Sequence, residues 1–255
     1  MKVFVSGYTG KMGQEVVRMV NREPDFTLVG QSRQGESLEK ALAQTQPDVM
    51  VDFTHPSTVY GNILIALQAG VIPIVGTTGL TDLQLTALEP FCQNAQLPVI
   101  ICPNFAIGAI LMMQLSQEAA KYMPRAEIIE YHHDNKADAP SGTAIKTADM
   151  MIEADPSINE QPLAGIELIE GARGANRHNI PIHSVRLQGF IASQCVLFGD
   201  RGQTLTIRHD TFSRESFMPG VALAIRKAPH VQGVIYGLEK LMHHHSKATA
   251  FDRIL

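Results

Sequence analysis

The chain has 255 residues, which is enough for one large domain or two domains of moderate size. Its hydrophobic content of 45% and charged content of 18% are typical of a globular protein in water. The net charge of −4 gives no general electrostatic attraction to nucleic acid or to an anionic membrane surface.

The N-terminus predicts a strand, a turn and a helix that together bind a nucleotide. Residues 2–6 form an apolar run that leads directly into the glycine loop 7–13, GYTGKMG, and a helical pattern follows. The three glycines would permit a tight turn, a close approach of the backbone to a pyrophosphate, and close packing of helix on strand. The GxxGxxG spacing is a weak signal by itself. Its position between strand and helix favours dinucleotide binding over a merely structural turn.

The second strand, predicted at residues 26–30, bears on the choice of nicotinamide cofactor. A Rossmann domain that prefers NAD usually places an acidic residue after this strand, where it binds the ribose hydroxyls. Here no acid occurs before Glu36, whereas Arg33, helped by Lys11, is placed to meet a 2′-phosphate. The segment therefore favours NADPH over NADH, although an arginine in a loop is most often simply solvated.

Strand and helix continue to alternate through the first 105 residues. Helices are predicted near residues 37–44, after Pro56, and after a cap at Thr81 or Asp82. Further strands are predicted at residues 48–53, 72–75 and 98–102. Five alternations indicate an open parallel sheet, in which ligands bind at the carboxyl ends of the strands. The segments after these strands would outline one cofactor crevice with the glycine loop: Thr54-His55, Gly76-Thr77-Thr78 and Asn104-Phe105.

Residues 127–144, EIIEYHHDNKADAPSGTA, are the strongest candidate for a catalytic site. Their alternation predicts a strand that ends near His132, and Ser141 is expected to cap a helix that continues to about residue 153. The imidazoles of His132 and His133 and the ammonium of Lys136 would then face a helix N-terminus, which suits a carboxylate or phosphate. Paired histidines are often structural, but these groups are costly to bury unpaired. The combination favours an anion site with a proton donor beside it.

The rest of the chain predicts a second, mixed domain. A long helix at residues 106–123 precedes the site, and residues 156–181 indicate a mobile loop around a short strand at residues 166–169. Three later runs are predicted to form antiparallel hairpins because Gly189 and residues 199–202 separate them: residues 182–187, 191–198 and 203–209. The apolar run 196–198 suggests a covered sheet face or a subunit contact.

The C-terminal part is expected to rejoin the first domain. Ser213-Arg214-Glu215 is predicted to open a helix that continues through Arg226, and residues 233–238 are expected to return to the first sheet. The histidine triplet 243–245 indicates a solvated tail more than a metal site.

Other features indicate what the chain does not do. The apolar run 106–113 is too short to span a bilayer, and the chain begins with a strand, so we expect no secretory leader. Cys92, Cys102 and Cys195 lack metal-type spacing and cannot all pair within one chain. We therefore expect reduced cysteines, a cytoplasmic location and no metal.

The segment from Glu130 to Ala144 resembles the signature of the dihydrodipicolinate reductase family of the diaminopimelate and lysine pathway. The likeness covers nearly the whole chain, except the tail after about Met242. Supporting matches lie in residues 7–13, 51–54, 76–79, 103–105, and Arg214 with 218–220.

The resemblance implies an α/β fold with two domains. A Rossmann-type parallel sheet would occupy residues 1–104 and about 214–255, and a central α+β mixed-sheet domain, residues 105–213, would bind substrate and build a homotetramer. The implied reaction is the reduction by NADH or NADPH of the cyclic imine dicarboxylate derived from 4-hydroxy-tetrahydrodipicolinate.

The resemblance also implies a role for each matching residue. His132 would be the proton donor or acceptor, and Lys136 a second proton donor; histidine suits this role because it titrates near neutral pH. Substrate would contact His133, Ser141, Gly142, Thr143 and Arg214. The nucleotide would contact Gly7, Tyr8, Thr9, Gly10, Lys11, Met12, Gly76, Thr77, Thr78, Cys102, Pro103, Asn104 and Phe105. Where the family often has an acid after the second strand, this chain has Arg33, which leaves the use of NADH open.

Two alternatives remain from the residues alone. A semialdehyde-type dehydrogenase would act through a cysteine nucleophile, for which Cys102 is the candidate, but a cysteine that ends an apolar strand is usually inert. A non-catalytic redox sensor that binds NAD(P) would leave His132, His133 and Lys136 without a task.

Overall fold

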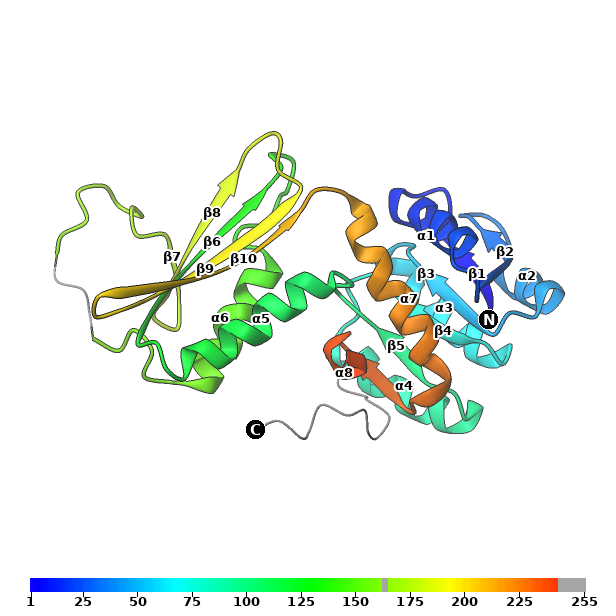
Figure 1. Ribbon diagram of the computed structural model, residues 1–255. Helices are drawn as coiled ribbons and strands as arrows, with labels where there is room; N and C mark the ends of the chain where they lie inside the picture. Colours follow the sequence, from blue (N-terminus) through cyan, green and yellow to red (C-terminus); the bar gives the residue numbers. More distant parts are fainter. Residues whose placement is uncertain (162–164, 243–255) are drawn as a thin grey trace. The chain divides into compact units, whose positions relative to one another are not determined.

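The computed structural model describes residues 1–161 and 165–242, and the chain divides into two compact units. Unit 1 comprises residues 1–107 together with the C-terminal segment that starts at Phe217, and unit 2 comprises Gly108–Ser216. The chain therefore crosses between the units twice (Figure 1).

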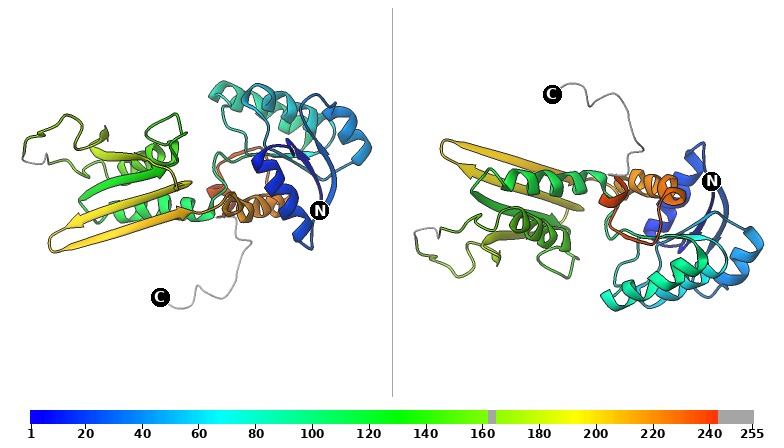
Figure 2. Two further views of the ribbon diagram at one scale, coloured as in Figure 1. Left: turned by 90° about the horizontal axis from the view of Figure 1, so that it is seen from above. Right: turned by 90° about the horizontal axis from the view of Figure 1, so that it is seen from below.

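Unit 1 is a doubly wound parallel sheet with helices on both faces (Figures 1 and 2). Its strand order is β11-β5-β4-β3-β1-β2, and every neighbouring pair is parallel. The elements before unit 2 are β1 Lys2–Ser6, α1 Lys11–Arg22, β2 Thr27–Ser32, α2 Leu38–Thr45, β3 Val49–Asp52, α3 Pro56–Gln68, β4 Ile72–Val75, α4 Asp82–Ala95 and β5 Val99–Ile101. Those after it are α7 Met218–Lys227, η2 Ala228–His230, β11 Val234–Tyr236 and α8 Glu239–Met242.

The sequence dictates this unit through short, largely apolar strands and clear helix starts. Every residue of β3 and β4 is buried, as expected for parallel strands covered on both faces. Thr81 caps α4 in a capping box with Gln84, which confirms one of the two predicted caps. The predicted return of residues 233–238 is also confirmed, because β11 pairs with β5.

Unit 2 is a mixed sheet with two helices packed on one face. Its strand order is β10-β9-β6-β8-β7; β6 and β8 are parallel, and the other neighbours are antiparallel. Its elements are α5 Ile107–Ala120, which begins at the last residue of unit 1, β6 Arg125–His132, α6 Gly142–Ala154, β7 Ala175–Arg177, β8 Ile180–Arg186, β9 Ala192–Asp200, β10 Gln203–Thr211 and the 3₁₀ turn η1 Arg214–Phe217, which ends at the first residue after unit 2. Ile128 of β6, Met151 of α6 and Phe198 of β9 lie in the core between sheet and helices.

Of the two hairpins predicted from residues 182–209, one is confirmed and one is wrong. β9 and β10 form an antiparallel hairpin, but β8 does not pair with β9, because β6 lies between them. In this arrangement Ile128 is buried between its register partners Ile182 and Val196. Pairing of β6 on both of its edges, which buries Ile128, takes the place of the local hairpin between β8 and β9.

Two further predictions need correction. Residues 166–169 form no strand; Ile166 and Leu168 are 89% and 94% exposed, and the short strand β7 comes later. The carboxylate of Glu167 accepts hydrogen bonds from the backbone N–H groups of Gly171 and Arg173, so this segment is folded as a turn.

The helix predicted from residue 213 also begins later than expected. A 3₁₀ turn, Arg214–Phe217, comes first, and α7 starts at Met218 with Pro219 in its first turn, where proline is tolerated. The histidine triplet 243–245 lies outside the described residues, as do residues 162–164 of the predicted mobile loop.

Candidate functional site

The link between β6 and α6 has the predicted form. His132 is the last residue of β6, and the hydroxyl of Ser141 caps α6 by accepting a hydrogen bond from the backbone N–H of Ala144 at 3.2 Å. A Cβ added at Gly142, the first residue of α6, would meet no atom within 4 Å. The helix N-terminus therefore opens onto free space that a ligand can enter.

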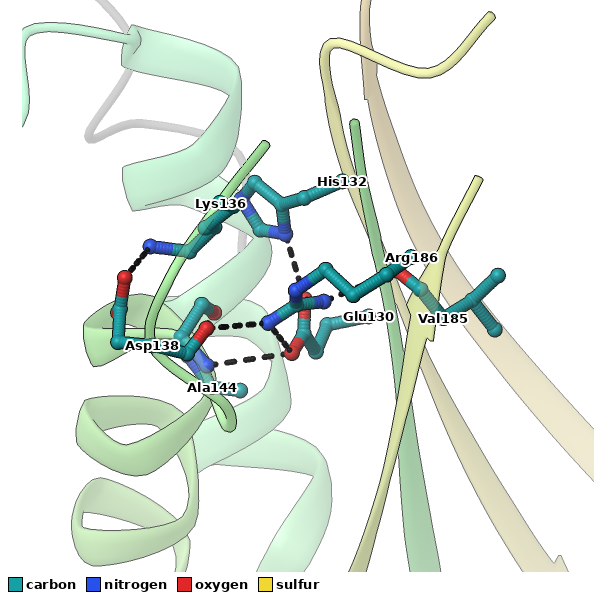
Figure 3. A network of polar contacts seen from close by, with 8 residues as sticks. Glu130, His132, Lys136, Asp138, Ala144, Val185 and Arg186 are labelled. Atoms are coloured by element: carbon teal, nitrogen blue, oxygen red, sulfur yellow. Dashed lines mark hydrogen bonds and ion pairs between the residues drawn. The ribbon is translucent and has the colours of Figure 1, made fainter. Parts of the chain in front are cut away.

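A buried carboxylate, which the sequence reasoning gave no role, organises this link (Figure 3). Glu130 has no exposed side-chain surface and accepts hydrogen bonds on both oxygens. The guanidinium of Arg186, on β8, donates to Oε1 at 2.8 Å and to Oε2 at 3.0 Å. Nδ1 of His132 lies 2.5 Å from Oε2, and the backbone N–H of Ser141 donates to Oε1 at 3.2 Å.

The ionisation of Glu130 decides which ring nitrogen of His132 faces it with a proton. Burial alone would raise the pKa of Glu130, but hydrogen bonds from His132 and Arg186 outweigh burial and lower the pKa to about 2. Glu130 is therefore an anion at neutral pH and can only accept hydrogen bonds. It follows that Nδ1 of His132 carries a proton, so Nε2 is the ring nitrogen that can exchange a proton with a ligand.

Lys136 lies on the same side of the network as His132 (Figure 3). Its ammonium is 2.5 Å from Oδ1 of Asp138, and this hydrogen bond lowers the pKa of Asp138. Arg186 also donates to the backbone carbonyl of Asp138 at 2.7 Å, which ties the loop to β8. The Lys136 side chain is 21% exposed, and its ammonium and the His132 imidazole lie in the link that leads to the N-terminus of α6.

A second candidate site is a cavity of about 570 Å³ in unit 1. Its size fits a bound small molecule. It is lined by residues from the glycine loop, the end of β2, the loop before α2 and the start of α3, including Gly7, Thr9, Gly10, Ser32, Arg33, Glu36, Phe53, Thr54 and His55. Tyr8, Lys11, Met12 and the predicted nucleotide segments 76–78 and 102–105 do not line it.

The glycine loop requires two of its glycines for the reasons that the motif suggests. Gly7 has φ +84°, and a Cβ there would lie 2.4 Å from the carbonyl oxygen of Phe53. A Cβ at Gly13 would lie 2.1 Å from the carbonyl oxygen of Gly7, so only glycine lets α1 start so close to the turn. The loop is thus a tight cradle of backbone that fits a dinucleotide phosphate.

Arg33 lines this cavity but is paired. Its backbone N–H and its Nε each donate to the carboxylate of Glu36 at 3.1 Å. The acid that the sequence places after Arg33 therefore folds back onto it. A nucleotide 2′-phosphate would have to compete with Glu36 for this guanidinium.

A buried acid that sequence reasoning gave no role also braces the crevice of unit 1. Asp52, at the end of β3, is fully buried and accepts from the backbone and hydroxyl of Thr54 at 3.0 and 2.7 Å. It also accepts from the hydroxyl of Thr77 at 2.9 Å and the amide of Asn62 at 2.8 Å. The rings of Phe53 and Phe105 lie 5.8 Å apart, centroid to centroid. These contacts join the ends of β3, β4 and β5, where the cofactor crevice was predicted.

The other predicted site residues make fewer contacts with the Glu130 network or none that the structure describes. Among the described residues, no hydrogen bond or ion pair joins Arg214 to the Glu130 network. Cys102 is 1% exposed, which disfavours it as a nucleophile. In residues 1–161 and 165–242, no group of three or more His, Cys, Asp or Glu side chains is placed to hold a metal ion. No helix in these ranges has the length and apolar character needed to cross a membrane.

A parallel-sheet unit with a glycine-loop cavity, followed by a mixed-sheet unit with a histidine and a lysine beside a helix N-terminus, fits the plan of two-domain nicotinamide-dependent oxidoreductases. The solved structure of an amine dehydrogenase from Mycobacterium smegmatis shares this fold at 11% identity, with a TM-score of 0.65 and coverage of 97% of each chain. At that identity the likeness concerns the fold alone.

Comparison with protein families narrows the class. Residues 1–105 match the family model "Dihydrodipicolinate reductase, N-terminus", and residues 108–242 match "Dihydrodipicolinate reductase, C-terminus". The chain belongs to the dihydrodipicolinate reductase family.

Full-length relatives agree with the family models. The chain is 47% identical to a 4-hydroxy-tetrahydrodipicolinate reductase of Listeria monocytogenes serotype 4b, with coverage of 95% of this chain and 100% of the relative. It is 46% identical to the enzyme of that name from Desulfitobacterium hafniense, at 95% and 98% coverage. A dipicolinate-bound dihydrodipicolinate reductase from Paenisporosarcina sp. TG-14 superposes with a TM-score of 0.86, at 42% identity and 94% and 98% coverage.

Proposed function

We propose that this chain uses NADH or NADPH to reduce the cyclic imine dicarboxylate derived from 4-hydroxy-tetrahydrodipicolinate to tetrahydrodipicolinate. This is a step of diaminopimelate and lysine biosynthesis. The observation that carries the proposal is the match along almost the entire length of relatives that bear the name of this reductase. The site supports it independently, because a dicarboxylate imine needs anion-binding groups and a proton donor.

His132 is the proposed proton donor. The nicotinamide supplies a hydride to the substrate ring when the cofactor is bound. Glu130 holds Nδ1 of His132 in its protonated state, so Nε2 is the atom that delivers a proton to the ring carbon made electron-rich. Lys136 is the second proton donor, and its ammonium also attracts a substrate carboxylate.

The dicarboxylate is proposed to bind at the start of α6. The N–H groups of Gly142 and Thr143 belong to the first helical turn and have no partner within the helix. They can donate to a carboxylate, and the helix dipole favours its charge. The N–H and hydroxyl of Ser141 already bond to Glu130 and Ala144, so Ser141 positions the turn. His133 and Arg214 complete the proposed substrate contacts.

The dinucleotide is proposed to bind to unit 1, which we assign as the dinucleotide-binding domain, with unit 2 as the domain for substrate and assembly. The glycine-loop cavity would hold the adenosine half and the pyrophosphate. Residues 76–78 and 102–105, braced by Asp52 and Phe53, would hold the nicotinamide half. Arg33 favours NADPH, and its pairing with Glu36 limits that preference.

We further propose a cytoplasmic homotetramer. The face of the unit 2 sheet opposite α5 and α6 presents half-buried or exposed side chains such as Ile129, Leu197 and Arg208. A sheet face of this kind suits contact with a second copy. Cys92, Cys102 and Cys195 form no disulfide bond, which is consistent with a reducing compartment.

The test is a coupled assay in which dihydrodipicolinate synthase supplies the unstable substrate. Oxidation of NADH and NADPH is followed at 340 nm, and kcat/KM is compared for the two cofactors. Turnover that depends on the synthase product supports the proposal. Cofactor binding without any turnover of this product would refute it and favour a redox sensor.

A further inference from the structure

The carboxylate of Glu130 is shared between two cationic groups from different strands. Arg186 reaches it from β8 and binds both oxygens, while His132, two residues along β6, binds Oε2 only. The parallel register that pairs His132 with Arg186 brings the three side chains together. All three are shielded, with side-chain exposures of 0% for Glu130, 16% for His132 and 18% for Arg186.

Other charged groups near His132 are engaged elsewhere. Lys136 is paired with Asp138 in the loop, and Gln188 donates to Asp134. On β9, the register partner of His132 is the uncharged Ala192. On α6, the N-terminal turn contributes backbone N–H groups, of which that of Ser141 binds Glu130. His133 follows in the chain. Among the contacts of the described residues, the ion pair that His132 makes is with Glu130, which Arg186 also binds.

The two neighbours act on His132 in opposite directions. An ionised Glu130 stabilises the imidazolium by charge and by a hydrogen bond. Arg186 repels the imidazolium by its positive charge. Its guanidinium also donates hydrogen bonds to the same Glu130 oxygens, which weakens the hydrogen bond between Glu130 and His132. Nε of Arg186 is buried without a hydrogen-bond partner in the described structure. A buried unsatisfied donor costs free energy, so the position of Arg186 beside Glu130 is not explained by hydrogen bonding alone.

We propose that Glu130 and Arg186 are paired positioning residues: Glu130 retains the proton on His132, and Arg186 loosens it so that it can be transferred. This inference rests on the proposed role of His132 as the proton donor. Glu130 and Arg186 need not touch the substrate to act in this way. They act through the ring that they hold.

The direct test measures the titration midpoint of His132 by hydrogen–deuterium exchange at its ring C2 position, read by mass spectrometry. A His133→Asn background separates the two neighbouring histidines. Glu130→Gln should lower the midpoint by about one pH unit or more, because an opposite charge is lost. Arg186→Gln should raise it by about half a unit or more, because Glu130 is then shared less.

A purely structural role of Glu130 and Arg186 predicts different shifts of the His132 titration midpoint. If the network only packs the loop, both variants loosen the ring, and the midpoint moves in the same direction, towards that of a solvated histidine. Shifts of the same sign would therefore overturn the proposal. Glu127→Gln is the matched control, because Glu127 lies on β6 like Glu130 and also pairs with a histidine, His183 of β8. The midpoint of His132 should not move in this variant.

Conservative variants replace the glutamine variants in this test if the latter do not fold. Arg186→Lys keeps a cation beside Glu130 and should keep the His132 midpoint close to that of the wild type. Glu130→Asp keeps the charge but shortens the reach to His132, so the midpoint should fall, by less than in Glu130→Gln. A drop in Arg186→Lys as large as that in Glu130→Asp would overturn the proposal.

The pH profile of turnover gives the second readout. A proton donor works below its titration midpoint, so the alkaline limb of kcat/KM should move to lower pH in Glu130→Gln and to higher pH in Arg186→Gln. The exchange measurement needs no turnover. If its shifts are absent, this inference fails and the proposed reductase activity stands; if they are present but no turnover is found in the wild type, the proposed function fails.

Discussion

Strand β6 carries two clusters of the same chemical composition, one on each face. Glu130 pairs with His132 and Arg186, and Glu127, three residues earlier, pairs with His183 and Arg173. The Glu130 cluster lies on the helix-covered face, where the carboxylate is fully buried. On the opposite face the side chain of Glu127 is 36% exposed, and Arg173 is 49% exposed.

The difference shows that burial, more than residue type, makes such a cluster suited to chemistry. Within a single subunit water screens the Glu127 cluster, so each ion pair there is worth little. In the Glu130 cluster the same contacts are shielded, and removal of one partner leaves an uncompensated buried charge. The following variants test this contrast, beginning with the largest expected effect.

Exchange of the histidines should separate the two clusters most strongly. His132→Gln is expected to lower kcat by about 100-fold or more, since a positioned proton donor contributes about that much. His183→Gln should leave kcat within about twofold, because the half-buried His183 pairs with Glu127 and not with Glu130. Steady-state kinetics measure kcat, and titration of intrinsic fluorescence quenching or calorimetry measures cofactor affinity, which neither change should alter. Near-normal turnover by His132→Gln would remove the role assigned to it.

The carboxylates should differ in stability. Glu130→Gln is expected to destabilise unit 2 by about 3 kcal/mol at pH 7, because Arg186 loses its buried partner. Glu127→Gln should cost less than about 1 kcal/mol, because its partners remain solvated. Urea unfolding monitored by circular dichroism gives both values, with the oligomeric state checked by light scattering. Equal losses in the two variants would mean that burial is not the deciding difference.

Low pH should remove the contribution of the ionised Glu130 to the free energy of unfolding. The pKa of Glu130 falls from 4.5 to about 2 on folding, so its ionisation stabilises the folded state fully above about pH 4.5. That contribution, about 3 kcal/mol, should disappear as the pH falls from 4.5 towards 2. The gap in stability between wild type and Glu130→Gln should therefore close over this range. A gap that stays constant down to pH 3 would contradict the low pKa.

The Arg33–Glu36 pair in unit 1 is a third ion pair for the comparison between buried and exposed clusters. It is exposed and lies at the glycine-loop cavity. Both side chains are about half exposed, so we expect variants there to change stability by less than about 1 kcal/mol. Arg33→Asp should lower kcat/KM for NADPH about tenfold more than for NADH, because one charge-assisted contact to a 2′-phosphate is lost. Glu36→Gln should raise the preference for NADPH about twofold to fivefold, because the guanidinium is released. Equal effects on both cofactors would refute the 2′-phosphate role.

Local patterns carried most of the sequence-based predictions that proved right. Apolar runs predicted β1 to β5, the glycines at 7 and 13 predicted a tight turn, and Ser141 predicted the start of α6. Each of these depends on residues that are close in sequence, whose conformational preferences are local. The same applies to His132 at the end of β6.

The features that were missed depend on long-range pairing. The position of β6 between β8 and β9 follows from burial of both of its edges, which no local pattern encodes. Arg186 meets Glu130 across 56 residues, and only the strand register reveals it. A signal for Glu130 was present, since residues 130 and 132 of a strand share a face, but its partner was not visible without the sheet.

A double-mutant cycle on Glu130 and His132 tests the central claim most directly, namely that the buried carboxylate acts through the histidine that transfers the proton. With the coupled assay, Glu130→Gln alone should lower kcat about tenfold and His132→Gln about 100-fold. If Glu130 acts through His132, the double variant should be no slower than His132→Gln alone, because no ring remains to be held. A thousandfold loss, at which the two effects simply multiply, would contradict the account.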